Sequence, residues 1–593
     1  MNILGISCYF HDAAAALLRD GQLVAAAEEE RFTRKKHDYE FPQHAIDFCL
    51  RSGGLRAADL DYVAFFEKPF VKFERLLLSS MQTFPRSHRV FREAMVNWLG
   101  DKLWVKSLIQ KRLGMAPSKI LFSEHHLSHA ASAFLCSPFS EAAILTVDGV
   151  GEWTTASLGI GQGTGIKLLK EIRFPHSLGL LYSAFTAFLG FEVNEGEYKV
   201  MGMAPFGTPR YLDKVHKLIR IGSDGDFELD MDYFSFHYSP DRTFNGKFCD
   251  LFGPPRPPET YFFTPASGYP SYFGAKPANY PQLAEQNRYY ADVAASIQAV
   301  TEEVLLKMAN YAHRETGLKR LCMAGGVALN SVANGKILRD TPFEQIYIQP
   351  AAGDGGCALG AALYAYHMVL GKPRTFVMEH AYWGEEHSAA EIEMFLKAHN
   401  IPYQALDEEE KLIERVVDQL QEGKVIGWSQ GRFEWGPRAL GNRSIIADPR
   451  RPEMKDVVNT KIKFREPYRP FAPSVLAEKA DQFFDLPEPA QHYPARFMLY
   501  VMEVKDDKRD SVPAITHVDG TGRLQIVEQA TAPRYYQLIR RFGEATGVPV
   551  LLNTSFNLRG EPIVNTPQEA FTTFSRSEMD LLVLGQYLIE KGR

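Results

Sequence analysis

The first thirty residues alternate between apolar and polar positions with the period of two that is typical of β-strands. The pattern predicts strands at 3–8, 13–18 and 22–27, with a tight turn at 19–21 between the last two. We therefore expect a β-meander whose first connection is the loop at 9–12.

Helices and strands alternate along the next three hundred residues. The spacing predicts a helix over 42–51 and a buried strand at 61–66. A second strand, glycine turn and strand at 142–160 repeats the opening pattern, and strand, glycine turn and helix follow at 320–330 and at 345–366. This order is typical of an α/β fold, and the repeated opening indicates a duplicated nucleotide-binding core.

The chain is too long for a single core, because cores stop growing at roughly 250–300 residues. The helical pattern ends in MVLGKPR, and a new pattern begins at Tyr382. We expect two domains, 1–372 and 373–593. Proline, glycine and aromatic residues crowd the stretch 253–281, which is either a packed cover or an acceptor-binding loop.

Composition narrows the class of protein. Hydrophobic residues make up 45% and charged residues 23%, as in soluble globular proteins. A net charge of −6 disfavours a nucleic-acid partner. No apolar segment reaches the length of a membrane span, the N-terminus does not resemble a secretory signal, and the six cysteines show no CxxC spacing. We expect a cytoplasmic protein with no membrane partner.

Four residues form a candidate metal site. His125 and His129 are four apart on a predicted helix, so both rings project from one face. Asp148 and Asp354 each lie in a glycine turn after an apolar strand, where side chains converge at the strand ends of an α/β sheet. Two imidazoles and two carboxylates suit iron, manganese or zinc. The alternatives are a surface histidine pair and two ordinary Asp-Gly turns.

Glycine turns offer backbone N–H groups that could hold the phosphates of a nucleotide. The sequence has no GxxxxGK[ST] motif, which excludes a P-loop, and no GxGxxG motif in the context of a dinucleotide fold. The candidate nucleotide-binding residues of the first domain are Gly149, Gly151, Gly325, Gly326 and Asn330.

The second domain contains cationic residues set among glycine, proline and β-branched residues. A cationic run is usually a solvated face, but this setting favours ordered loops, and forked guanidinium groups suit a polyphosphate. Asparagine and serine side chains could complete such a site. The candidate residues are Arg438, Arg443, Lys463, Arg465, Arg523, Asn553, Ser555 and Asn557.

Several long motifs in a fixed order resemble a known family. The segments are GISCYFHDAAAAL, EHHLSHAASAF, TVDGVGEWTT, NEGEYKVMGMAPFG, AGGVALN, PAAGDGGCALGAA, EWGPRALGNRSI, KFREPYRPFAPSV, HVDGTGRLQ and NTSFNLRGEPIV. Together they resemble the NodU/CmcH-type O-carbamoyltransferases over nearly the whole chain, most weakly at 70–115 and 210–300.

The resemblance implies an N-terminal domain of the duplicated actin/Hsp70/sugar-kinase (ASKHA) type and a C-terminal YrdC-like α/β domain. It implies that the C-terminal domain forms carbamoyl-adenylate from carbamoyl phosphate and ATP, releasing pyrophosphate, with Mg²⁺ expected. The N-terminal domain would transfer the carbamoyl group to a hydroxyl of a small molecule or sugar.

The resemblance also assigns residues. It places an iron (Fe²⁺) site on His125, His129, Asp148 and Asp354, and it places phosphate contacts on Lys463, Arg465 and Arg523 with Ser555 beside them. It places a functional histidine at His11, whose neutral imidazole, near its ordinary pKa, could remove the hydroxyl proton. Asp12 is the second candidate base.

Several alternatives stay open. A tRNA threonylcarbamoyl transferase would need a basic RNA-facing surface, and a sugar kinase or Hsp70-like ATPase would leave the arginines of the second domain unused. A nucleotide-sensing binding protein would bind without turnover. The acceptor stays open among nodulation oligosaccharide, aminoglycoside, cephem and macrolide, and so does a homodimer.

Overall fold

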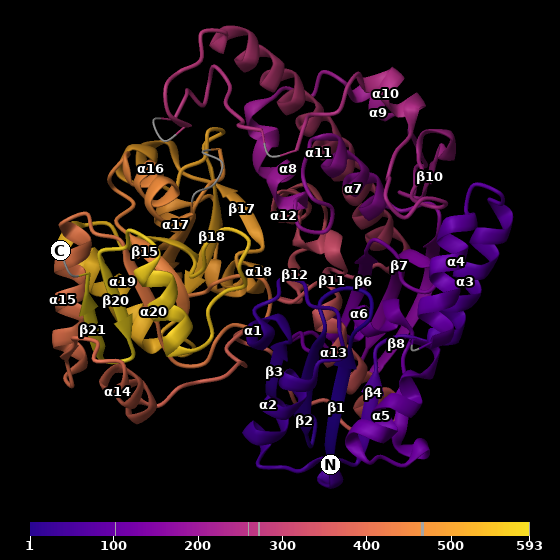
Figure 1. Cartoon of the computed structure of the whole chain (residues 1–593), viewed down its shortest axis with the longest axis horizontal. Coiled ribbons are helices and arrows are strands. Elements are labelled where there is room, and N and C mark those ends of the chain that lie inside the picture. Colours follow the sequence, from indigo (N-terminus) through magenta and orange to yellow (C-terminus); the bar gives the residue numbers. More distant parts are fainter. Residues whose placement is uncertain (101, 259, 271–272, 464–467, 592–593) are drawn as a thin grey trace. The chain divides into compact units, whose positions relative to one another are not determined.

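The computed structural model describes every residue except 101, 259, 271–272, 464–467 and 592–593, and it divides the chain into two compact units (Figure 1). The N-terminal unit comprises 1–26, 39–268 and 277–378, and the C-terminal unit comprises 27–38, 269–276 and 379–593. The division near residue 378 lies close to the boundary that the sequence suggests.

The N-terminal unit contains two five-stranded sheets with the same strand order, β3-β2-β1-β4-β5 and β8-β7-β6-β11-β12. In each sheet the first strand pairs antiparallel with the second and parallel with a later one. The duplication and the opening meander are therefore confirmed. The strands are β1 (Asn2–Ser7), β2 (Ala14–Arg19), β3 (Gln22–Glu28), β4 (Tyr62–Phe65), β5 (Ile120–Phe122), β6 (Glu141–Val147), β7 (Thr154–Gln162), β8 (Gly165–Arg173), β11 (Arg320–Ala324) and β12 (Gln345–Ile348).

Two small-residue helices pack against each other and against these sheets. Helix α6 (His125–Phe134) packs on β6 and β11, and α13 (Asp354–Leu363) packs on β1 and β2. A Cβ atom on Gly360 would lie 1.9 Å from the carbonyl oxygen of Ser128, and one on Gly5 would lie 1.8 Å from that of Ala358. Glycine at these two positions permits the close backbone approach.

The longest element is α11 (Tyr280–Thr316), which follows turns and irregular chain in the described part of 253–279. The predicted helix at 42–51 is α2 (Gln43–Gly53), and its C-cap Gly54 has the left-handed conformation that ends a helix. The remaining longer helices of this unit are α3 (Pro69–Gln82), α4 (His88–Gly100), α5 (Val105–Leu113), α7 (Leu178–Phe188), α8 (Glu197–Met203), α10 (Gly246–Phe252) and α12 (Ser331–Asp340).

The C-terminal unit contains a nine-stranded mixed sheet of order β13-β21-β20-β14-β15-β19-β16-β18-β17. Its strands are β13 (Gln404–Ala405), β14 (Ile426–Ser429), β15 (Arg443–Ala447), β16 (Ala472–Leu476), β17 (Tyr500–Glu503), β18 (Thr521–Val527), β19 (Val550–Ser555), β20 (Leu581–Leu584) and β21 (Tyr587–Glu590). Its longer helices are α14 (Ala389–Ala398), α15 (Glu409–Gln421), α19 (Pro533–Thr546) and α20 (Pro567–Ser575).

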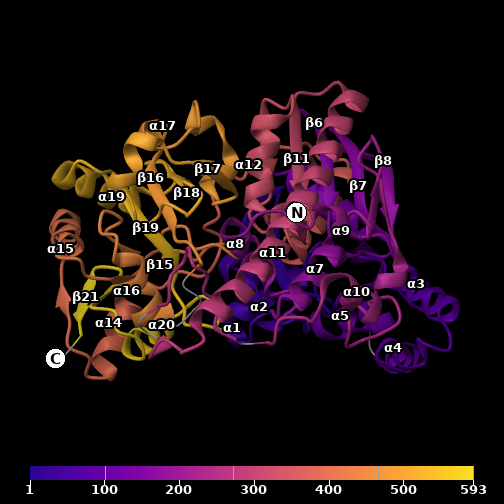
Figure 2. The same cartoon turned by 90° about the horizontal axis from the view of Figure 1, so that it is seen from above.

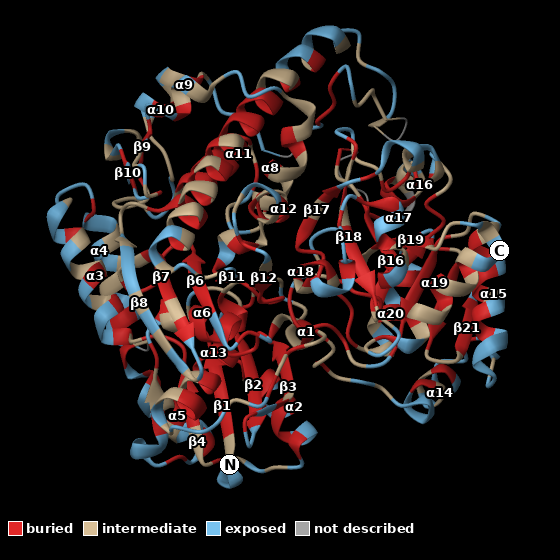
Figure 3. Cartoon of the chain, turned by 180° about the vertical axis from the view of Figure 1, so that it is seen from behind, coloured by how far each residue is buried: buried red, intermediate tan, exposed pale blue. Residues whose placement is uncertain are grey.

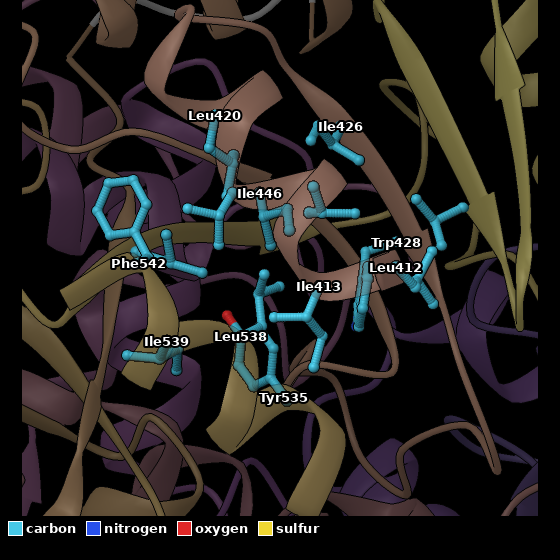
Figure 4. Packing of buried hydrophobic residues seen from close by; sticks show 14 of the residues in the cluster. Leu412, Ile413, Leu420, Ile426, Trp428, Ile446, Tyr535, Leu538, Ile539 and Phe542 are labelled. Carbon is cyan, nitrogen blue, oxygen red and sulfur yellow. The ribbon is translucent and has the colours of Figure 1, made fainter. Parts of the chain in front are cut away.

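The core of this unit lies between the sheet and helices α15 and α19 (Figure 4). Leu412 and Leu420 of α15 and Leu538 and Phe542 of α19 meet Trp428 of β14, and all five side chains are buried. The apolar residues recur on one face of each helix, so the amphipathic pattern directs both helices onto the sheet.

A short segment early in the chain belongs to the C-terminal unit. Helix α1 (Glu30–Thr33) lies in the segment 27–38. Arg31 is buried and donates to the carbonyl of Gly436, whose own N–H donates to Glu28 at 2.8 Å. Arg34 donates to the carbonyl of Ile563. The predicted division at residue 372 does not include this exchange of segments.

Candidate functional site

Helix α6 carries the two predicted histidines on one buried face. His125 is its first residue and His129 stands one turn later, and both side chains are fully buried. Their Nε2 atoms lie 3.1 Å apart. The alternative of a solvated histidine pair is therefore excluded.

The two predicted aspartates face these nitrogens from the carboxyl ends of β6 and β12. Asp148 Oδ2 lies 3.3 Å from Nε2 of His125 and 3.9 Å from that of His129. Asp354 Oδ1 lies 3.6 Å from each of the same two nitrogens. Strands β6, β11 and β12 run parallel, which brings the residues after β6 and β12 to one edge of the sheet.

These separations fit the ligand shell of one metal ion. Four ligands at about 2.1 Å from a tetrahedral ion would lie about 3.4 Å from one another, and the observed distances run from 3.1 to 3.9 Å. Oδ2 of Asp354 is buried and has no hydrogen-bond partner among the described residues. The four side chains therefore form a buried candidate metal site.

The shifted pKa values of His125 and Asp148 show how strongly the charges in the site interact. Burial lowers the pKa of His125, but the carboxylates of Asp354 and Asp148 outweigh this effect and raise it to about 9. Burial raises the pKa of Asp148, but the facing imidazoles of His125 and His129 hold it well below its usual range. A cation bound at this position would balance the negative charges of the Asp148 and Asp354 carboxylates.

The carboxylate of Glu152, which the sequence analysis did not single out, ties the site to helix α3. It accepts the backbone N–H of His125 at 3.0 Å and that of Lys68, the N-cap residue of α3, at 2.8 Å. Arg75 of α3 is buried and donates to the carbonyl of Gly151 at 2.8 Å. The motif DGVGEW contains the glutamate, but its two partners lie far away in the sequence.

The predicted nucleotide-binding glycines lie against the metal site. The N–H of Gly326 donates to Oδ1 of Asp148 at 2.7 Å, and a Cβ on Gly151 would lie 2.9 Å from the His125 ring. Asn330 accepts the N–H of Ala333 and so caps α12. Gly325 has φ of +96° and Gly149 accepts from Ser177. Phosphate binding by these residues stays a prediction.

His11 and Asp12 lie together in the loop after β1. Nδ1 of His11 stands 3.3 Å from Oδ2 of Asp12, and both side chains are partly buried. Burial lowers the pKa of His11, but Asp12, followed by Asp354 and Asp148, raises it to about 9. The expectation of an ordinary pKa is therefore wrong for the metal-free chain, because the charges of three carboxylates act on the ring.

In the C-terminal unit the structure brings Lys463, Ser555 and Asn557 together. Nζ of Lys463 donates to Oδ1 of Asn557 at 2.8 Å and to its carbonyl at 3.0 Å, and it reaches Oγ of Ser555 at 3.3 Å. Oγ of Ser555 donates to Oδ1 of Asn557. Lys463 is buried and its ammonium donates to oxygens of Ser555 and Asn557, so it orders this part of the fold, and phosphate binding by it stays a prediction.

Arg523 lies on β18 near a second cation. Desolvation lowers the pKa of half-buried His517 to about 4; Asp519 opposes this shift, and the charges of Lys455 and Arg523 add to it. Phosphate binding by Arg523 stays a prediction.

The described residues among the remaining predicted phosphate contacts are engaged within the fold or partly exposed. Arg443 is buried and directs its guanidinium at backbone carbonyls, including those of Gln430 and Asn565, so the structure gives it a supporting role. Asn553 is buried and donates to Ser474 and Gln525 on neighbouring strands. Arg438 is half-buried, and Arg465 lies outside the described residues.

Residues 2–363 match the family model of the carbamoyltransferase N-terminus, and residues 417–591 match that of the carbamoyltransferase C-terminus. The chain belongs to the carbamoyltransferase family. The resemblance in the sequence motifs is thus confirmed, and the chain is an enzyme of this family.

Alignments with relatives cover nearly the whole length of this carbamoyltransferase. The uncharacterized protein sll1178 of Synechocystis is 48% identical over 100% of this chain and 97% of its own. Nodulation protein NolNO of Sinorhizobium fredii is 40% identical over 98% of this chain and 79% of its own. Nodulation protein U of the same species is 27% identical over 94% of each chain.

Among solved structures, HypF of T. kodakarensis aligns with a TM-score of 0.30 and 15% identity over 63% of this carbamoyltransferase and 48% of HypF. At that score the likeness carries no functional weight.

Within the described part of the chain, every helix is too short or too polar to cross a bilayer.

Proposed function

We propose that this carbamoyltransferase activates carbamoyl phosphate with ATP in its C-terminal unit and transfers the carbamoyl group to a hydroxyl in its N-terminal unit. The observation that carries the proposal is the presence of two chemically different sites in one family member. One is a buried set of two imidazoles and two carboxylates, and the other contains buried Lys463 with Ser555 and Asn557.

The proposed activation step forms carbamoyl-adenylate and pyrophosphate. Water first releases inorganic phosphate from carbamoyl phosphate and leaves carbamate. A carbamate oxygen then forms a bond to the α-phosphorus of ATP while the bond from that phosphorus to pyrophosphate breaks. Such chemistry needs groups that hold phosphates, and the cations Lys463, Arg523 and Lys455 supply positive charge in a unit that the proposal treats as YrdC-like. Mg²⁺ would accompany the ATP.

The proposed transfer step uses the residues of the metal site. His125, His129, Asp148 and Asp354 would hold a divalent ion, iron being the ion that the family suggests. When bound, the ion supplies Lewis acidity that draws electron density from an acyl or phosphate oxygen. Asp12 is the main cause of the raised pKa of His11, and the charge of the ion would offset the smaller contributions of Asp354 and Asp148.

His11 then has the role of a general base. Its neutral imidazole would take the proton of the acceptor hydroxyl as the oxygen attacks the carbamoyl carbon and AMP leaves. Asp12, at 3.3 Å, would orient the ring and stabilise the imidazolium that forms. The acceptor is a hydroxylated small molecule or sugar.

Arg523→Ala tests the assignment of the activation step. Losing one charge-assisted phosphate contact should slow the carbamoyl-phosphate-dependent release of pyrophosphate about a hundredfold. Arg540→Ala is the matched control, because Arg540 is partly exposed on α19 and pairs with Glu544 on the same helix. Undiminished release by folded Arg523→Ala protein would remove this arginine from the mechanism.

A further inference from the structure

Exposed apolar side chains gather on one helical hairpin of the N-terminal unit. Among the described residues, sixteen large hydrophobic side chains are exposed, and nine of them lie between residues 70 and 104. The most exposed are Phe84 (72%), Val96 (69%), Phe70 (65%) and Met81 (64%), followed by Leu99 and Trp104. Scattered single residues are normal on a surface, but so dense a group marks an interaction site.

This hairpin, α3 with α4, is held firmly from its inner side. Phe73 and Trp98 pack their rings together between the two helices. Lys72 of α3 forms a buried ion pair with Glu67, and Arg75 reaches the carbonyl of Gly151. Figures 1 and 2 show the hairpin at the margin of the unit, and Figure 3 shows its outer side exposed. The apolar surface is therefore a stable feature of the fold.

The same segment carries a strong positive charge. Residues 69–113 contain nine lysines and arginines against three acidic residues, a surplus of six in a chain whose net charge is −6. Lys72 and Arg75 are used inside the fold, whereas Arg86 and Arg92 are exposed, as are Lys106, Lys111 and Arg112 of α5. We call the exposed apolar and basic residues of α3, of α4 and of the turn between them (70–99) the hairpin surface.

The charge decides between two occupants of this surface. A second copy of the chain would pair the surface with itself across a two-fold axis and bring like charges together, which costs affinity. A bilayer with anionic headgroups attracts the basic residues and takes up the aromatic and aliphatic side chains at its interface. We propose that the hairpin surface docks this carbamoyltransferase onto an anionic membrane surface.

Docking of this kind needs no membrane-spanning helix, and it differs from the sequence expectation of no membrane partner, which stays a prediction. Phe70, Met81, Phe84 and Val96 would enter the headgroup region, while Arg86 and Arg92 would remain at the phosphates. The proposal goes beyond the proposed function and is independent of it, because binding can be measured without turnover.

The test is co-sedimentation of the full chain with vesicles of phosphatidylcholine alone or with about one third phosphatidylglycerol. We expect at least tenfold tighter binding to the anionic vesicles in 0.1 M salt, and loss of that difference near 0.5 M salt, because salt screens the headgroup charge. Absence of binding to anionic vesicles, or equal binding to both compositions, would overturn the proposal.

Two double variants test whether the hairpin surface is the part of the protein that binds the vesicles. Met81→Ser with Phe84→Ser, and separately Arg86→Gln with Arg92→Gln, should each weaken binding to anionic vesicles at least tenfold. Met394→Ser is the matched control, since Met394 is 66% exposed on α14 of the other unit, and it should bind as wild type. Circular dichroism melting checks the fold. A dimer in solution that Phe84→Ser disperses would instead assign the surface to a second copy.

Discussion

At the scale of single residues, the metal site depends on four side chains from three separate segments of the chain. Replacing His129 by alanine removes one of the four candidate ligands and leaves an unfilled space among the three that remain, all of them buried. We expect His129→Ala to lower the affinity for the metal by more than about a hundredfold, because even changes outside the ligand shell cost 10 to 100-fold.

Elemental analysis of His129→Ala after dialysis against a weak chelator measures this loss. His126→Ala is the matched control, since His126 is equally buried on the same helix but bonds Thr146 and lies outside the ligand set. Stoichiometric metal in folded His129→Ala protein would contradict the site as described.

His517 supplies a pH-dependent prediction. Its pKa in the fold is about 4, below the value of 6.5 in an unfolded chain, so the fold favours the neutral ring. As the pH falls from 6.5 to 4, His517 binds a proton in the unfolded chain but stays neutral in the folded chain. The free energy of unfolding therefore falls by about 3 kcal/mol. His517→Gln should remove this part of the pH dependence.

Urea unfolding at pH 5 and pH 7 measures the difference for wild type, His517→Gln and the control His399→Gln, whose side chain is exposed on the C-terminal unit. Since all other histidines are common to the proteins, they cancel in the comparison. An unchanged pH dependence in His517→Gln would show that the ring titrates normally in the fold.

At the scale of elements, the contact between α6 and α13 sets the spacing of the metal ligands. One helix carries both histidines and the other begins at Asp354. A Cβ on Gly360 would lie 1.9 Å from the Ser128 carbonyl, so Gly360→Val must push the helices apart. We expect a loss of about 1–3 kcal/mol of stability and weaker metal binding, although residue 360 is not a ligand.

Calorimetric titration of metal into Gly360→Val, compared with Gly353→Ala, checks this prediction. A Cβ on Gly353 meets no atom within 4 Å, so this control changes a glycine beside α13 without affecting the helix contact. Wild-type affinity in Gly360→Val would mean that the helices can separate without moving the ligands.

The strands around the site could be predicted because their signals are local. Alternating apolar residues with turn residues between them define β1 to β3 and the pair β6 and β7, and parallel strands explain why Asp148 and Asp354 meet. The roles of Glu152 and of Gly326 could not be predicted, because each depends on a contact with a distant segment.

The segment 27–38 shows the same limit for domain boundaries. Its sequence, AEEERFTRKKHD, has the charge pattern of a solvated surface. In the fold, however, Arg31 is buried because it donates to the carbonyl of Gly436, and the segment joins the C-terminal unit. The charge pattern alone predicts that Arg31 is solvated, because its hydrogen-bond partner lies about four hundred positions away in the sequence.

At the scale of the whole molecule, the account assigns two half-reactions to two units of one chain. The phosphate-binding candidates Lys463, Ser555 and Asn557 lie in the C-terminal unit, and His11 with the metal ligands lies in the N-terminal unit. A change in one unit should therefore impair one half-reaction and leave the other intact.

The most direct measurement follows both half-reactions in His11→Asn protein loaded with metal. The account predicts wild-type release of pyrophosphate from ATP and carbamoyl phosphate, together with transfer to a hydroxyl acceptor slowed by roughly two to four orders of magnitude, as for a lost general base. Carbamoyl transfer at the wild-type rate, or loss of pyrophosphate release together with transfer, would contradict this division of labour.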